Sequence, residues 1–115
     1  MNKQIPFAIF VGLAALCFGV LIYHVIGVIQ PFDKSPAWRH AIFIGVCSIS
    51  VYGLLKRPEW FVWFFGLLVV QQLYSHGSHL INQLNNGKII WIDVVVIIIT
   101  PIVFILLLAD RKTKQ

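Results

Sequence analysis

Five ionisable side chains interrupt or border the apolar stretches of this sequence: His24, His40, His76, His79 and Asp93. Imidazole nitrogens and carboxylate oxygens ligate zinc, iron or manganese, and two histidines on facing helices can hold a b-type haem. The same groups can also act as acid and base. Because ionisable groups are costly inside a bilayer, a cluster of them predicts a functional site.

The composition of the chain indicates a membrane protein. Of its 115 residues, 59% are hydrophobic and only 11% are charged, which is too apolar for a soluble domain of this size. Four crossings of about 20 residues each would use most of the chain, so we expect a single domain over residues 1–115 in contact with the lipid bilayer. The net charge of +5 comes from basic residues at the ends of apolar runs, which predicts no nucleic-acid partner.

The apolar runs predict an all-α polytopic membrane protein, an antiparallel up-and-down bundle of four transmembrane helices at approximately 6–29, 36–55, 58–80 and 88–109. Pro31 ends the first run, while Pro36 and Pro58 are placed to begin the second and third. A polar loop rich in Asn and Gln, within 82–87, separates the last two runs. Pro101 is expected to kink the fourth helix.

Basic residues predict the orientation of these four crossings. An even number of crossings places both termini on one side of the membrane. One set of basic residues then faces the compartment of the termini: Lys3, Lys56, Arg57, Arg111, Lys112 and Lys114. The smaller opposite set is Lys34, Arg39 and Lys88. The positive-inside bias therefore predicts a multi-pass inner-membrane protein whose N- and C-termini are cytoplasmic.

The helical rise places most of the ionisable side chains at one depth. At 1.5 Å per residue, His24, His40, His76 and Asp93 lie roughly 8 to 10 Å outward from the middle of their own helices. His79 lies one turn further out, on the same face as His76. The secondary residues of the predicted site are Gln72, which extends this face inward, Arg39 and Ser75.

These positions predict a one-sided His/Asp pocket in the outer, periplasmic leaflet. Its ligand would be a metal ion, a b-type haem or a small lipophilic molecule, with the haem held by His76 and either His24 or His40. Asp93 paired with His24, His76 or Arg39 would instead be purely structural, and His40 and His79 could simply reach the headgroups. Each interpretation depends on the rotation of the helices.

Three functions remain open at this level. The first is a metal-, haem- or ligand-binding protein, and the second is a non-catalytic accessory or assembly subunit with other membrane subunits, or a second copy of the chain, as partners. The third is a small membrane enzyme in which a histidine and Asp93 act as acid and base and Ser75 or Ser78 as nucleophile. No catalytic motif occurs, so the enzymatic hypothesis is the least favoured. Cys17 and Cys47, each seven residues deeper than His24 or His40, are interpreted as packing residues.

Overall fold

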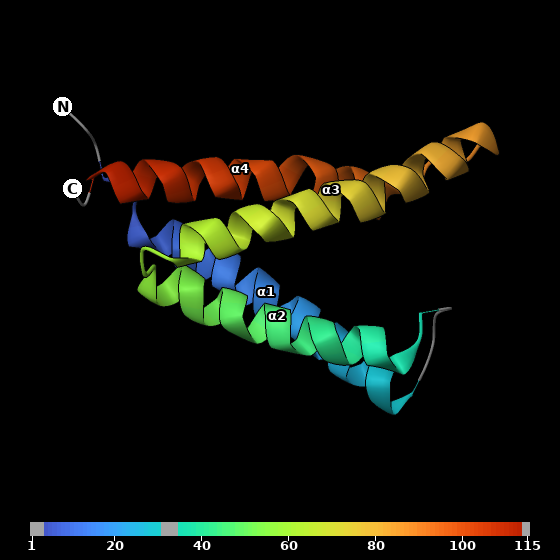
Figure 1. The fold of residues 1–115 in the computed structure, drawn as a ribbon, viewed down its shortest axis with the longest axis horizontal. Helices are drawn as coiled ribbons and strands as arrows, with labels where there is room; N and C mark the ends of the chain where they lie inside the picture. The colour runs from blue at the N-terminus through green and yellow to red at the C-terminus, as the bar shows by residue number, and fades with distance from the viewer. Residues whose placement is uncertain (1–3, 31–34, 114–115) are drawn as a thin grey trace. The chain divides into compact units, whose positions relative to one another are not determined.

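Four α-helices make up the computed structural model, which describes residues 4–30 and 35–113. They are α1 (Phe7–Ile29), α2 (Ala37–Lys56), α3 (Phe61–Asn85) and α4 (Trp91–Thr113) (Figure 1). No strand occurs in these two ranges, so the predicted all-α class with four helices is confirmed. Several residues used in the sequence predictions lie outside the described ranges: Lys3, Pro31, Lys34 and Lys114.

The largest difference from the predicted helix limits is at the end of α3. This helix continues to Asn85, through residues predicted as a polar loop. It ends because Gly87 adopts a positive φ of 72° and the next N–H, that of Lys88, returns to the Gln83 carbonyl at 2.8 Å. This is the glycine-terminated arrangement that satisfies the last carbonyls of a helix. Polar composition alone therefore did not end the helix.

Three of the helices are long and apolar enough to cross a membrane: Phe7–Ile29, Ala37–Lys56 and Trp91–Lys112. Large apolar side chains lie exposed along them, including Leu16, Ile42 and Ile102. Such surfaces suit a lipid solvent, so the chain is an α-helical membrane protein. The second half of α3 carries Gln, Ser and His side chains, and its crossing at 58–80 stays a prediction.

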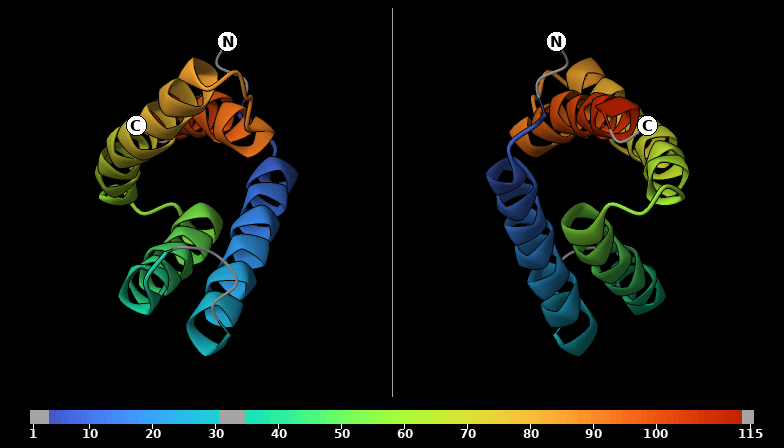
Figure 2. Two further views of the ribbon diagram at one scale, coloured as in Figure 1. Left: turned by 90° about the vertical axis from the view of Figure 1, so that its right-hand side faces the viewer. Right: turned by 90° about the vertical axis from the view of Figure 1, so that its left-hand side faces the viewer.

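The chain divides into two compact units, one of which spans Pro6–Pro58 and contains α1 and α2, while the other contains α3 and α4. In each unit two consecutive helices pack side by side, which makes an antiparallel helical hairpin (Figures 1 and 2). The organisation of residues 1–115 as a single domain stays a prediction.

The α1–α2 hairpin has a seam of buried side chains spaced by three and four residues. Phe10 and Ala14 contribute from α1, and Cys47, Ser50 and Leu54 contribute from α2. This spacing keeps one stripe of each helix turned toward its partner. At the end of the hairpin away from its connecting loop, the Arg57 guanidinium lies 4.6 Å from the centre of the Phe10 ring, a cation–π contact.

The α3–α4 hairpin is built in a similar way. Its buried apolar side chains are Phe61, Val62, Phe65 and Val69 from α3 and Val103 and Leu107 from α4. The Arg111 guanidinium lies 5.4 Å from the Trp63 ring centre, again away from the connecting loop. Gly66 allows the Phe104 ring to approach α3, since a Cβ at this glycine would lie 3.0 Å from Phe104 Cε2.

Replacing Gly66 by leucine is expected to destabilise the α3–α4 hairpin by about 1–3 kcal/mol, because the added side chain must displace the Phe104 ring. Gly77→Leu on the same helix is the matched control, because a Cβ there meets no described atom within 4 Å. SDS-induced unfolding of the purified protein measures both changes. Equal destabilisation by the two substitutions would contradict the packing described here.

Candidate functional site: two histidine clusters

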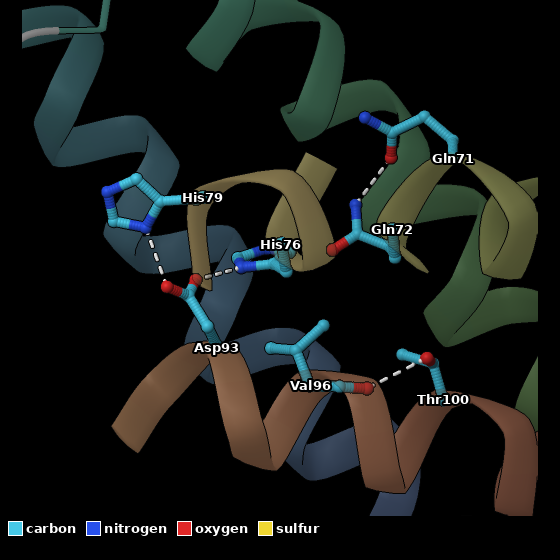
Figure 3. A network of polar contacts seen from close by, with 7 residues as sticks. All are labelled: Gln71, Gln72, His76, His79, Asp93, Val96 and Thr100. Carbon is cyan, nitrogen blue, oxygen red and sulfur yellow. Dashed lines mark hydrogen bonds and ion pairs between the residues drawn. The ribbon is translucent and has the colours of Figure 1, made fainter. Parts of the chain in front are cut away.

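Asp93 connects α4 to two histidines of α3. Its side chain is only 3% exposed, and its Oδ1 lies 2.6 Å from Nδ1 of His76. Its Oδ2 lies 2.6 Å from Nδ1 of His79 (Figure 3). An ionised carboxylate can only accept hydrogen bonds, so each imidazole donates its Nδ1–H. We call His76, His79 and Asp93 the Asp93 clasp.

Local structure places these three side chains together. His76 and His79 are three residues apart on α3, so they lie on adjacent turns of one face. Asp93 lies in the first turn of α4, where a carboxylate is favoured by the helix dipole. A buried carboxylate is costly unless its oxygens are hydrogen-bonded, and the two imidazoles provide a donor for each oxygen.

The clasp determines which imidazole nitrogens remain for a ligand. If Nδ1 carries the proton of a neutral imidazole, Nε2 carries the lone pair. The His76 side chain is 27% exposed and that of His79 is 52% exposed. Both Nε2 atoms are without a polar contact in the part of the chain that the structure describes. They are therefore available to accept a hydrogen bond or to ligate a metal ion.

The geometry of the clasp does not support a metal centre with Asp93 among the ligands. Both carboxylate oxygens already bind imidazole N–H groups, and the two rings reach the carboxylate from different sides (Figure 3). Among residues 4–30 and 35–113, no group of three or more His, Cys, Asp or Glu side chains is arranged to hold a metal ion. Asp93 instead orients the two histidines.

The other two histidines meet within the α1–α2 hairpin. His24 and His40 place their Nδ1 atoms 2.9 Å apart, so one ring donates and the other accepts. The His40 side chain is buried, with its ring against Gly27, where a Cβ would lie 2.8 Å from three ring atoms. His24 stacks on Phe43, with ring centres 5.2 Å apart. The direct contact of the two histidine rings leaves no space for a porphyrin between them.

The three secondary residues of the predicted site have other surroundings. Gln72 donates from Nε2 to Oε1 of Gln71 at 2.6 Å (Figure 3). The Arg39 guanidinium lies 6.0 Å from the Phe43 ring centre, and Ser75 is partly buried beside His76 in the sequence. The sequence prediction did not include Gln71 in the site, although its position directly before Gln72 could have indicated it.

The predicted site residues thus fall into two groups, one in each hairpin. His76, His79 and Asp93 form the first, and His24 and His40 form the second. Both groups join their two helices near the connecting loop, whereas an Arg–aromatic contact joins them at the other end. The two hairpins therefore share one plan of interhelical contacts. The predicted haem pairs that include His76 draw on both groups and stay predictions.

The fold and these clusters define an α-helical membrane protein in which polar contacts join consecutive helices. No model of a known protein family, no curated protein and no solved structure matches the chain. The geometry of the two clusters is thus the basis for assigning a function.

Proposed function

We propose that this protein is a small multi-pass protein of the inner membrane that binds a lipophilic ligand carrying a hydroxyl group. The ligand would reach the Asp93 clasp in the outer leaflet and donate its O–H to Nε2 of His76 or His79. One observation carries this proposal. The two Nδ1 contacts of 2.6 Å to a buried carboxylate leave two Nε2 lone pairs on partly exposed rings.

The surroundings of the clasp favour a lipophilic ligand over a water-soluble one. Exposed apolar side chains lie near it in the sequence on both helices, among them Leu73, Tyr74 and Ile92. A molecule dissolved in the bilayer would meet this surface directly, and one hydroxyl would supply the donor that Nε2 needs. A metal ion uses the same lone pair and is the alternative that the test must separate from the hydroxyl ligand.

Binding can be tested with two probes that differ only in the donor. In detergent micelles containing protein with ¹⁵N-labelled histidine, 4-hexylphenol is expected to shift an Nε2 resonance of His76 or His79. The matched ether 4-hexylanisole, which has no O–H, is expected to leave it in place. His76→Phe and His79→Phe assign the resonances and should remove the corresponding response. Equal shifts with both probes would overturn the proposal. Stoichiometric binding of Zn²⁺ by the unmodified protein, lost in both variants, would show instead that the ligand of this site is a metal ion.

A second candidate is the accessory or assembly subunit, and the saturation of Asp93 favours it. Both carboxylate oxygens of Asp93 accept hydrogen bonds from α3 within one hairpin. A contact whose role is only to hold α3 against α4 needs no other partner. Purification at native expression level separates the two functions. A stoichiometric membrane partner together with no phenol response supports the subunit, whereas a phenol response from the isolated chain supports the ligand-binding protein.

The proposed orientation has its own test. Both termini are expected in the cytoplasm, with the Asp93 clasp toward the periplasm. Alkaline phosphatase, which is active only outside the cytoplasm, should be inactive when fused after Gln115 and active when fused within residues 86–88. The reverse pattern would move the clasp to the inner leaflet.

A further inference from the structure

Cys17 and Cys47 lie in the seam of the α1–α2 hairpin. Neither forms a disulfide, Cys47 is buried and Cys17 is partly buried. They belong to the α1–α2 hairpin, whereas the Asp93 clasp belongs to the α3–α4 hairpin. Their positions relative to each other follow from the register of the two helices.

The His24–His40 contact determines this register. The Nδ1 atoms of the two rings are 2.9 Å apart, so these positions face each other across the antiparallel pair. Seven residues back along α1 is Cys17, and seven residues forward along α2 is Cys47. A step of seven residues returns to nearly the same face after two turns, about 10 Å along the axis. The two thiols therefore face each other across the seam.

The packing of the seam agrees with this register. Continuing the same alternation of three and four residues pairs Ala14 with Ser50 and Phe10 with Leu54, and all four of these side chains are buried. Cys17 and Cys47 lie between these buried pairs and the His24–His40 contact along the hairpin. The register on both sides of the two cysteines therefore supports their facing positions.

We propose that Cys17 and Cys47 form a two-coordinate site for a soft monovalent metal ion, Cu(I), in the α1–α2 seam. Soft sulfur ligands select Cu(I) among the common metal ions. Structural zinc needs four ligands, and no group of three or more His, Cys, Asp or Glu side chains is placed for a metal in the residues that the structure describes. Two facing sulfurs suffice for Cu(I), which accepts linear coordination.

The low polarity of the seam determines the protonation of the complex. A charge buried among apolar side chains is costly, so a neutral complex is favoured. One thiol loses its proton to the solvent, and the resulting thiolate and the remaining thiol bind Cu⁺. The charges of thiolate and ion cancel. No electron is transferred, and one proton is released for each ion bound.

The test is a titration of the reduced protein with Cu(I) under anaerobic conditions, in competition with the coloured chelator bathocuproine disulfonate. One ion per chain and about one proton released per ion are expected. Cys17→Ser and Cys47→Ser should each weaken binding more than tenfold. Ser48→Ala is the matched control, because Ser48 is an α2 neighbour whose hydroxyl bonds only its own helix, at Ile44 O.

A measurement on the unmodified protein guards against misfolded variants. Bound Cu(I) should protect both thiols from alkylation by N-ethylmaleimide, and X-ray absorption should show a copper ion with two sulfur neighbours. Unchanged affinity in the double serine variant would overturn the proposal. Protection of only one thiol, or a copper ion with nitrogen neighbours alone, would overturn it as well.

Discussion

Replacing Asp93 by asparagine is expected to lower the free energy of unfolding by about 1–3 kcal/mol. Hydrogen bonds to a charged group are each worth about 1.5–3 kcal/mol in water-soluble proteins, and about 0.6 kcal/mol is typical between membrane helices. The asparagine amide keeps one acceptor oxygen but replaces the other with a donor. It therefore cannot accept from both His76 and His79, whose Nδ1 atoms each lie 2.6 Å from the carboxylate.

SDS-induced unfolding in micelles measures this change, and Thr100→Val is its control on the same helix. The Thr100 hydroxyl donates to Val96 O within its own helix α4, so its loss should change the free energy of unfolding by only about 0.5 kcal/mol or less. Similar effects of the two substitutions would show that the Asp93 clasp does not stabilise the hairpin.

Replacing Gly27 by alanine is expected to destabilise the α1–α2 hairpin by about 1–3 kcal/mol. The new Cβ would lie 2.8 Å from three atoms of the His40 ring, a separation that real Cβ atoms essentially never show. Because His40 is buried, its ring has little space to retreat. The ring should shift, and the Nδ1 contact with His24 should lengthen or break.

Gly19→Ala separates this steric effect from helix propensity. Gly19 lies on α1 like Gly27, and a Cβ at Gly19 would meet no described atom within 4 Å. Alanine is favoured over glycine inside a helix by about 1 kcal/mol, so this control should leave the stability unchanged or slightly raised. The ¹⁵N resonances of His24 and His40 should move in Gly27→Ala alone. Equal stability of the two variants would contradict the close packing of His40 on α1.

The helices themselves were largely predictable from local sequence. The apolar runs predicted four helices, and Pro36 directly precedes α2 as expected. Pro58 was wrong as the start of the third helix, because α3 begins at Phe61, and the observed limits differ most at the end of α3. There, Asn82 and Gln83 were predicted to form a loop because they are polar. Polar residues continue a helix where nothing breaks it, and the break came only at Gly87, whose left-handed conformation needs no Cβ.

The contacts of the site were less predictable. The sequence predicted that His24, His40, His76 and Asp93 share one layer with His79 one turn further out, and it could not choose among their possible partners. An error of one residue in the register turns a helical side chain by about 100°. Whether His24 meets His40 or Asp93 therefore depends on which faces of the helices pack together.

The sequence by itself determined that this is an all-α membrane protein, because length and apolar composition are properties of each segment alone. Only the tertiary structure decided that Asp93 accepts from both His76 and His79 and that His24 meets His40. Packing across each seam sets these pairings. Gly27 shows the reason most directly, since the absence of one side chain on α1 is what allows the His40 ring of α2 to lie there.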